Sequence, residues 1–411
     1  MNPSQPTPVD NPHKMEASPF RCHIFNFGIK FFSEVGGVKM SLKDCTYNDY
    51  RNIVVNEIPL IDFRAPVEFE KGAFINAVNL PIMNNEEREK VGICYKEKGN
   101  EEAVKLGHQL VSGDIKKDRV QGWVDFLTKN PNALIYCFRG GQRSQIAQEW
   151  IYEATGIMVP RLAGGYKEFR NYLISSLEPE NIKAQPIIIS GYTGAGKTIF
   201  INEIEETVDL EGLANHRGSA FGKHVNGQPT QITFDNNLAY KIIQNEEKGH
   251  KIMILEDEGR NVGRCYLPKS LAQHFADSPH IILEVSFFQR VNNTLEEYVI
   301  HGQKEHEYLF GYEEGLAQWK NHMEESFMQI KRKLGGELHQ RILDSFNDAY
   351  EYQLKNKDFD YHKNWIEYLL KEYYDPMYEY QLKKIQDKII FKGTEKEILN
   401  RLDLFKREIG I

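Results

Sequence analysis

The sequence predicts an α/β protein in which two domains follow one another and a helical region ends the chain. Two short apolar segments, 133–136 and 186–190, each lead directly into a glycine-containing loop and then a helical pattern, as in strand–loop–helix units. After a further apolar segment, 281–285, the pattern is helical to the end. A chain of 411 residues is long enough for two domains and a helical appendage.

Composition and charge exclude several classes of protein. The chain has 41% hydrophobic and 27% charged residues, as ordinary soluble globular proteins do, and no apolar run approaches a membrane span. Its five cysteines lack the spacing of a zinc site or a disulfide framework, which favours a reducing cytoplasm. Because the net charge is -8, a nucleic-acid partner would need a local basic patch. Two lysine-rich stretches, 329–333 and 383–392, are candidates, although such runs are usually solvated helix faces.

The domain boundaries follow from changes in composition. Residues 1–40 begin with a segment rich in Pro, Asn and Ser, and we expect a poorly ordered extension there. We place the first domain at 41–178, a polar linker at 179–185 and the second domain at 186–300. The helical C-terminal region takes the remaining residues, 301–411.

The loop after the first apolar segment, Cys137–Ser144, has the composition of an anion site. It places a cysteine at the C-terminal end of a strand, followed by two glycines and a helix N-terminus. Glycines allow consecutive backbone N–H groups to point inward and hold an anion. The helix dipole and Arg143 add positive potential, and each effect favours thiolate over thiol. We therefore expect Cys137 to be a nucleophile of lowered pKa, although a lone cysteine is usually a small buried hydrophobe. The residues expected to hold the anion are Arg139, Gly140, Gly141, Gln142, Arg143 and Ser144.

The spacing Cys-x-x-Gly-x-x-Arg-Ser fits tyrosine phosphatases and also resembles the active loop of rhodanese (sulfurtransferase) domains, many of which have a loop one residue shorter. Residues 59–81 favour the second family, because an Asp-x-Arg motif at Asp62 and an Asn-Leu-Pro motif at Asn79 each end a predicted strand. Residues 162–166 resemble the closing strand and Gly-Gly turn of that family. The resemblance implies a rhodanese-like domain with a parallel sheet. Cys94 has no anion-loop context, and we interpret it as structural.

The second apolar segment leads into Gly191–Thr198, which reads G-x-x-x-x-G-K-T, the phosphate-binding P-loop. In such a loop backbone amides cradle a phosphate, the lysine adds a positive charge and the threonine hydroxyl can hold magnesium. The motif predicts that an oligophosphate binds, and it does not identify ATP as that ligand. The residues that carry it are Gly191, Gly194, Gly196, Lys197 and Thr198.

Three further segments are candidates for contacts in the second domain. An apolar segment at 251–258 ends in acids, of which Glu256 or Asp257 could complete a magnesium site; solvated acids at a strand end are an equally good interpretation. Residues 208–222 are small and glycine-punctuated, with His216 and Arg217 at their centre. A third segment, 372–381, crowds aromatic residues around an acid, which ordinarily indicates a packed helix end.

Taken together, the cysteine loop, the P-loop and these segments resemble the bacterial tRNA 2-selenouridine synthases, from about Met40 to the C-terminus. That family exchanges sulfur for selenium at C2 of the wobble 2-thiouridine of certain tRNAs, using selenophosphate. It is also associated with S-geranylation of the same thiouridine from geranyl diphosphate. The resemblance implies tRNA as partner, selenophosphate and geranyl diphosphate as co-substrates, and a selenophosphate-producing enzyme as a further candidate partner.

The same resemblance suggests roles for the two loops. The P-loop, with magnesium at Thr198, would hold the diphosphate of the prenyl donor. Cys137 would take selenium as a perselenide, and Arg139 and Arg143 would steer the anion and stabilise the departing phosphate. His216 and Arg217 would be magnesium or substrate contacts, as would the acids at 256 and 257.

Two alternatives remain open at this point. One is a thiol sulfurtransferase or rhodanese-fold phosphatase fused to a nucleotide-binding module; a phosphatase would need a general acid, which the sequence does not identify. The other is a nucleotide-sensing binding protein with a rhodanese-like scaffold. A domain that serves only as a scaffold does not need the cysteine, so the presence of Cys137 counts against this alternative.

Overall fold

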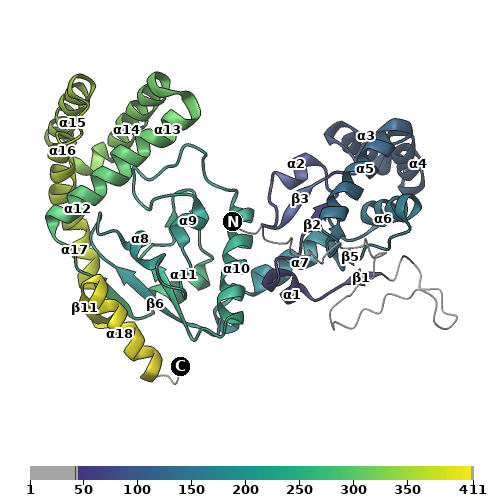
Figure 1. Cartoon of the computed structure of the whole chain (residues 1–411), viewed down its shortest axis with the longest axis horizontal. Coiled ribbons are helices and arrows are strands. Elements are labelled where there is room, and N and C mark those ends of the chain that lie inside the picture. Colours follow the sequence, from purple (N-terminus) through teal and green to yellow (C-terminus); the bar gives the residue numbers. More distant parts are fainter. Residues whose placement is uncertain (1–41, 43–44, 409–411) are drawn as a thin grey trace, which may run out of the picture. The chain divides into compact units, whose positions relative to one another are not determined.

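The structure, a computed structural model, describes residue 42 and residues 45–408 (Figure 1). The expected N-terminal extension therefore lies outside the described residues. No helix in the part of the chain that is described combines the length and apolarity that crossing a bilayer requires. The expectation of an α/β protein is confirmed, because two parallel sheets alternate with helices along the chain.

The first domain is built on a five-stranded, fully parallel sheet in the order β1-β5-β4-β2-β3. Leu60 pairs with Leu134 and Asp62 pairs with Tyr136, so β2 and β4 run in register through the middle of the sheet. The strands are β1 (Thr46–Tyr47), β2 (Leu60–Asp62), β3 (Ala77–Asn79), β4 (Leu134–Tyr136) and β5 (Arg161–Leu162).

Helices cover both faces of this sheet, which explains its continuously apolar strands. Neighbouring residues of one strand enter different cores, since Leu134 packs in the cluster that contains Phe169 and Ile135 packs in the cluster that contains Trp123. The helices are α1 (Tyr50–Val55), α2 (Pro66–Phe69), α3 (Asn85–Lys98), α4 (Asn100–Leu110), α5 (Gly113–Lys129), α6 (Gln142–Thr155) and α7 (Gly165–Ser175).

Helices α3 and α4 form a hairpin between β3 and β4. A capping box starts α3, in which Asn84 accepts from the backbone of Glu87 and the Glu87 carboxylate accepts from the backbone of Asn84. Gly99 ends α3 at φ +86° and at once precedes α4. The two helices pack against each other across this glycine turn.

The second domain contains a four-stranded parallel sheet in the order β11-β10-β6-β7, with β6 at the centre beside β7. A short antiparallel pair, β8 and β9, lies outside it. The strands are β6 (Gln185–Ser190), β7 (Ile252–Glu256), β8 (Asn261–Val262), β9 (Cys265–Tyr266), β10 (His280–Leu283) and β11 (Ile389–Gly393). The helices before the C-terminal region are the 3₁₀ helix η2 (Pro179–Asn181), α8 (Lys197–Ile201), α9 (Leu210–Ala214), α10 (Gln231–Glu247), α11 (Lys269–Ala276) and α12 (Phe287–Thr294).

The expectation of an entirely helical C-terminal region is wrong at one element. Strand β11 returns from the helices and pairs with β10 at the edge of the second sheet. Its apolar run is only three residues long and lies between two lysines, a pattern that is equally common on the face of a helix. The strand is also only partly buried, since Ile390 is 44% exposed. Pairing with a strand more than a hundred positions earlier in the sequence decides the matter.

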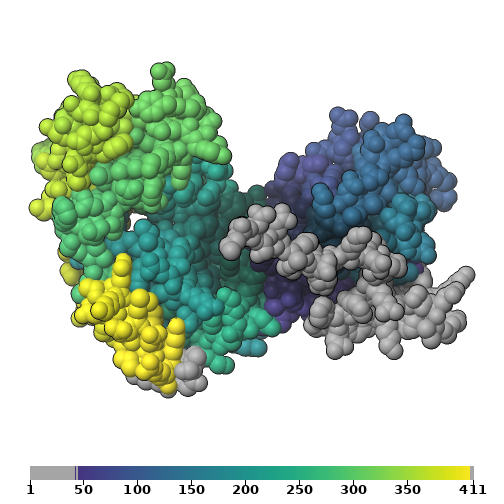
Figure 2. Space-filling model, viewed as in Figure 1, coloured from purple at the N-terminus to yellow at the C-terminus, as the bar shows by residue number. Residues whose placement is uncertain are grey.

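The remaining C-terminal elements are helical and enclose an aromatic core. Helices α14, α15 and α16 pack beside one another, as the adjoining green and yellow-green surfaces in Figure 2 show. Trp319, Phe327, Phe346 and Trp365 fill the space between them. The elements are the π-helix η3 (Leu295–His301), α13 (Gly302–Phe310), α14 (Tyr312–Leu334), α15 (Gly336–Asn356), α16 (His362–Leu369), the π-helix η4 (Leu370–Tyr374), α17 (Asp375–Lys384), η5 (Gln386–Lys388) and α18 (Glu395–Glu408).

Candidate functional site

Cys137 follows directly after β4, in the middle of the first sheet, and the loop that it begins ends where α6 starts. Its Sγ lies 3.3 Å from Ser144 Oγ and 3.9 Å from the carbonyl oxygen of Gly141. Ser144 Oγ is also 3.0 Å from that same oxygen and donates to it. A hydroxyl this close to sulfur is placed to donate to a thiolate once one forms.

The loop keeps its shape through a close approach to the closing Gly-Gly turn. Gly140 has φ +63°, and a Cβ there would come within 3.0 Å of the Gly165 nitrogen. The backbone N–H of Tyr166 donates to the Cys137 carbonyl, and Arg161 donates to the Gly140 carbonyl. The two glycine pairs of the sequence therefore allow two backbone segments to touch.

The Asp-x-Arg motif forms a buried clamp behind this loop. Arg64 Nε donates to Asp62 at 2.8 Å, and Tyr136, the residue before the cysteine, donates its hydroxyl to the same carboxylate at 2.8 Å. The Arg64 guanidinium also stacks on the Tyr166 ring, 3.7 Å from its centroid. Burial, followed by the Asp62 charge, raises the pKa of Tyr136 well above its ordinary value, so its hydroxyl stays a donor. This motif positions the loop, and it does not reach the sulfur.

The two arginines of the loop differ in their partners. Arg143 forms a two-pronged pair with Glu68, at 2.6 and 3.2 Å, and Arg88 lies 3.5 Å from the same carboxylate. Burial by itself would raise the pKa of Glu68, but Arg143 outweighs it and holds that pKa below its usual range. Much of the Arg143 charge is thus already compensated. Arg139 is exposed and makes no ion pair with any described residue, so it is the cation of the loop left to meet an anion.

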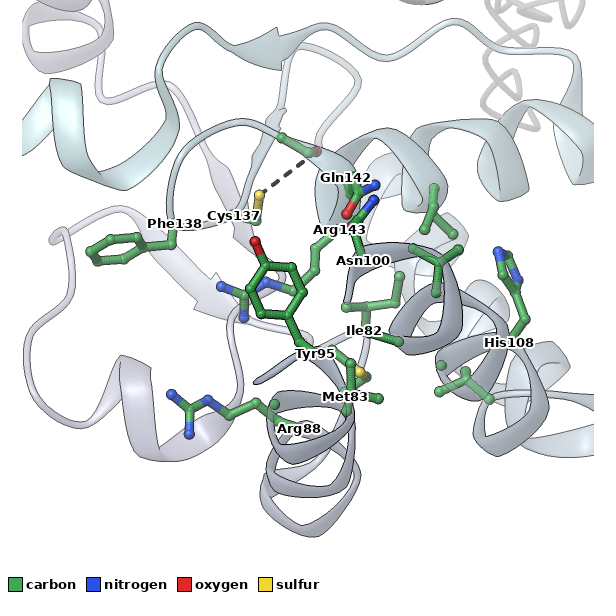
Figure 3. Close-up of a pocket in the computed structure, with 18 of the residues that line it drawn as sticks. Ile82, Met83, Arg88, Tyr95, Asn100, His108, Cys137, Phe138, Gln142 and Arg143 are labelled. Carbon is green, nitrogen blue, oxygen red and sulfur yellow. Dashed lines mark hydrogen bonds between the residues drawn. The ribbon is translucent and has the colours of Figure 1, made fainter. Parts of the chain in front are cut away.

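A cavity of about 720 Å³ opens beside Cys137 (Figure 3). The cysteine loop forms one wall of it, and the α3–α4 hairpin forms the opposite wall. Four of the residues expected to hold an anion line it, namely Arg139, Gly141, Gln142 and Arg143. A space of this size is typical of sites for whole small molecules and exceeds what one small anion fills.

The P-loop joins β6 to α8, as the motif predicts. Gly194 and Gly196 have φ +80° and +75°, which favours glycine, and Gly191 approaches β10 so closely that a Cβ would lie 3.1 Å from the Leu283 carbonyl. Lys197 Nζ donates to the Gly191 carbonyl at 3.0 Å, inside the loop that would hold the phosphate. The expected diphosphate-binding residues are thus in one place.

The acidic aromatic segment 372–381 braces the P-loop from the C-terminal region. Asp375 forms a two-pronged ion pair with the buried Arg290, whose Nε donates to the Thr193 carbonyl in the loop at 2.9 Å. Tyr378 packs on Tyr192 of the loop, with ring centroids 4.5 Å apart. Sequence reasoning missed this function, because the pattern showed only an aromatic helix end. The structure adds that the π-helix η4 immediately precedes Asp375, and π turns are frequent at functional sites.

The acids expected to hold magnesium are engaged in other contacts. Glu256 is buried at the end of β7 and accepts from the backbone of Leu210, while Asp257 accepts from the Ser190 hydroxyl at 2.7 Å. The carboxylate beside the P-loop is instead Glu211, which accepts from Thr198 Oγ1 at 2.9 Å.

Glu258 shares the space around Glu211. A Cβ added to Gly218 would lie within 3 Å of a carboxylate oxygen of each glutamate. Burial, followed by the Glu211 charge, raises the pKa of Glu258 well above its ordinary value. Two facing carboxyls beside a threonine hydroxyl form an all-oxygen donor set that suits magnesium. The described residues contain no cluster of three or more His, Cys, Asp or Glu side chains arranged for a metal, so the remaining ligands would be phosphate oxygens and water, as is usual for this ion.

His216 and Arg217 hold the loop that carries Gly218. His216 is buried and accepts from the Gly218 backbone N–H at 3.1 Å, and burial, helped by nearby positive charges, lowers its pKa to about 4. Arg217 pairs with Glu297 and Glu305 at η3 and α13. Both side chains therefore position the segment around the glutamate pair, and neither faces the Lys197 amine in any contact that the structure gives.

Comparison with known proteins agrees with this geometry. The model of the tRNA 2-selenouridine synthase AAA domain matches residues 184–408, and that of the rhodanese-like domain matches residues 49–172. The tRNA 2-selenouridine synthase of Sulfurovum sp. (strain NBC37-1) is 49% identical over 351 residues, which cover 85% of this chain and 96% of the relative. The chain belongs to the tRNA 2-selenouridine synthase family. The resemblance seen in the motifs is thereby confirmed, as is the order of the two folds.

Further relatives extend the same result. The tRNA 2-selenouridine synthases of Hydrogenovibrio crunogenus and Shewanella pealeana are 48% and 44% identical, over 84% and 89% of this chain and 95% and 100% of theirs. Among solved structures, the N-terminal domain of a putative ATP/GTP binding protein from Clostridium difficile 630 is 31% identical and covers 31% of this chain and 98% of its own, and its TM-score of 0.29 is too low to bear on the fold.

The brace on the P-loop gives a prediction about stability. Asp375→Asn removes the counter-charge of a buried guanidinium, so we expect the free energy of unfolding to fall by about 3 kcal/mol. Pyrophosphate with magnesium should also raise the melting temperature less than it does in the wild type. Glu372→Gln is the matched control, because this acid of the same segment is exposed. Equal melting curves for the two variants, with and without pyrophosphate, would contradict the bracing role.

Proposed function

We propose that the protein replaces sulfur by selenium in the wobble 2-thiouridine of tRNA, using selenophosphate, through an S-geranylated intermediate made from geranyl diphosphate. The observation that carries the proposal is the presence of two separate anion loops of different chemistry, one with a nucleophile and one without. Cys137 and Arg139 serve the first, and Lys197 and Thr198 serve the second. The names of the relatives supply the tRNA and the selenium.

Geranylation belongs to the P-loop. The sulfur of thiouridine attacks the first carbon of geranyl diphosphate, the carbon–oxygen bond breaks, pyrophosphate leaves with the electron pair, and the N3 proton of the base is released. Lys197 and the loop amides stabilise the charge on this leaving group. Thr198, Glu211 and Glu258 would hold magnesium, which supplies further charge to the pyrophosphate. The product is a thioether, whose sulfur leaves C2 far more easily than a thiocarbonyl sulfur does.

Selenation belongs to the cysteine loop. The Cys137 thiolate attacks the phosphorus of selenophosphate, the phosphorus–selenium bond breaks and selenium leaves as selenide with the electron pair. Selenide attacks C2 of the geranylated base, and geranyl thiolate departs and takes up a proton. Water then frees the phosphate from the cysteine. Arg139 meets the anion at the open side of the loop, and the backbone amides of the helix start receive the phosphate oxygens.

A perselenide on Cys137 is the other route for the same residue. Selenium in selenophosphate is already at the level of selenide, so a perselenide requires either a two-electron oxidant or the release of phosphite. Attack at phosphorus requires neither and yields phosphate. Phosphorus NMR of the products distinguishes the two, since phosphate and phosphite resonate at separate positions.

A selenophosphate-producing enzyme is the expected supplier of the anion. Because selenophosphate is readily oxidised and hydrolysed in water, direct transfer between the two proteins would protect it. We also propose that the protein works in the cytoplasm, where tRNA is available.

Replacing the nucleophile should stop selenation alone. We expect Cys137→Ser to lower 2-selenouridine formation by about a thousandfold or more, because a serine hydroxyl in place of the thiol is almost never ionised and is a far weaker nucleophile. Geranylation of 2-thiouridine tRNA should continue. Nucleoside chromatography of digested tRNA measures both. Cys94→Ser is the matched control, since this cysteine lies on α3 and does not line the cavity. Full selenation by the Cys137 variant, or equal loss in both variants, would refute the assignment.

Replacing the P-loop lysine should stop geranylation alone. We expect Lys197→Ala to lower S-geranyl-2-thiouridine formation by about a hundredfold or more, because a preorganised charge on a leaving group is lost. Supplied with tRNA that is already geranylated, and with selenophosphate, the variant should form 2-selenouridine at the wild-type rate. Loss of both reactions to the same extent would show that the two loops do not divide the chemistry.

A further inference from the structure

The cavity beside Cys137 is far larger than the anion that the loop would hold. Every residue that lines it lies between Glu68 and Trp150, so it belongs entirely to the first domain. Figure 3 shows Cys137 on one side of it and Ile82, Met83 and Tyr95 across from the sulfur. Selenophosphate needs only the loop itself, which leaves most of the 720 Å³ without a function.

The walls away from the loop are mainly apolar. Side chains before and on α3, on α4 and on α6 contribute to them, and the residues that matter most here are Ile82, Met83, Val91, Val104, Ile146 and Trp150. The cationic side chains among the lining residues include Arg88, Lys96 and Arg139. An apolar hollow with a few cationic groups suits a ligand that has an apolar body and a polar end.

Exposed apolar side chains surround the same cavity. Ile93 is 50% exposed and Tyr95 is 57% exposed, and both line it from α3. Phe138, next to the nucleophile, is 39% exposed and also lines it. Single exposed apolar residues are common, but several around one hollow indicate a surface that a ligand covers.

We propose that this cavity binds the geranyl chain of S-geranyl-2-thiouridine and thereby places C2 of the base beside the cysteine loop, where selenide is released from selenophosphate. This inference rests on the proposed function, in which a ten-carbon apolar group is attached to the sulfur that leaves. Selenophosphate alone, or a thiouridine without the geranyl group, would leave the apolar walls in contact with water. The cavity therefore selects the geranylated base over the free thiouridine and holds geranyl thiol after it leaves.

Gly107 offers a substitution that fills the cavity without disturbing the fold. It lies on α4 and lines the cavity, and the nearest atom to an added Cβ is Val91 Cγ2, at 3.9 Å. Gly107→Phe therefore places a ring in the space proposed for the chain. Gly107→Ala controls for the loss of glycine. Gly122→Phe controls for a new aromatic side chain, because Gly122 lies on α5, has no atom within 4 Å of an added Cβ and does not line the cavity.

The test is equilibrium binding of anticodon stem-loop RNAs, without selenophosphate, to the full chain. The probes carry 2-thiouridine alkylated on sulfur with either a methyl or a geranyl group. We expect the wild type to bind the geranyl RNA at least about tenfold more tightly than the methyl RNA, because the additional carbons of the geranyl chain are buried in the cavity and removed from water. Gly107→Phe should abolish that preference and leave the methyl RNA within about twofold of the wild type. Gly107→Ala and Gly122→Phe should keep the preference.

Two results would overturn the proposal. The first is a wild type that binds both RNAs equally. The second is a Gly107→Phe variant that keeps the geranyl preference, which would place the chain elsewhere, for example beside the P-loop. Failure of the proposed function has a different signature: the geranyl preference and its loss in Gly107→Phe would be seen, while geranylated tRNA is never converted to 2-selenouridine. That result would support the cavity as a prenyl site and refute the order of the reactions.

Discussion

Both domains share one arrangement, in which a glycine-containing loop follows the carboxyl end of an interior parallel strand and, as we propose, holds an anion on its backbone N–H groups. β4 has this place in the first sheet and β6 in the second. A loop that turns its amides inward needs φ values that favour glycine, and each loop has them, at Gly140 in one and at Gly194 and Gly196 in the other. The side chains then differ: the first loop carries Cys137 and two arginines, and the second carries Lys197 and Thr198 and has no cysteine.

Each loop needs contacts with other segments, because its glycines leave the backbone free to adopt many conformations. The first is held by the Gly-Gly turn at the start of α7 and by Arg161 on the Gly140 carbonyl. The second is held by Arg290, which Asp375 orients from the C-terminal region. Ion pairs also compensate part of the charge at the loops. Arg143 is compensated by Glu68, so Arg139 is the cation of the cysteine loop that has no ion pair with any described residue.

Glu211 and Glu258, beside Thr198, are two carboxyl groups without a cation between them, and this affects the stability of the folded chain. Because the pKa of Glu258 is raised, the folded chain keeps a proton that the unfolded chain would release. The pair therefore lowers stability as the pH rises above the ordinary pKa of a glutamate, and a bound cation would remove that cost. Cation binding would in turn displace the proton and strengthen with pH. Such an arrangement suits a metal that arrives with its phosphate ligand rather than one that resides permanently.

The sequence predicted what is local. The strands before Cys137 and before the P-loop lie within one residue of their expected positions, because a strand, a glycine loop and a helix follow one another directly in each case. Features formed by distant pairs were missed. Arg290 and Asp375 are 85 positions apart; Asp375 lies in the segment 372–381 that the sequence singled out, but nothing in the sequence indicated Arg290 as its partner. Glu211 lies within the segment 208–222 and had no predicted role, since only the fold brings it to Thr198.

The central claim is that geranylation precedes selenation and that each has its own loop. A single-turnover time course with the wild-type protein tests it most directly, with 2-thiouridine tRNA, geranyl diphosphate and selenophosphate present together and the nucleosides separated after rapid quenching. The account predicts that S-geranyl-2-thiouridine rises first and then falls at the rate at which 2-selenouridine appears. Formation of 2-selenouridine without a geranylated precursor, or at an unchanged rate when geranyl diphosphate is left out, would contradict it.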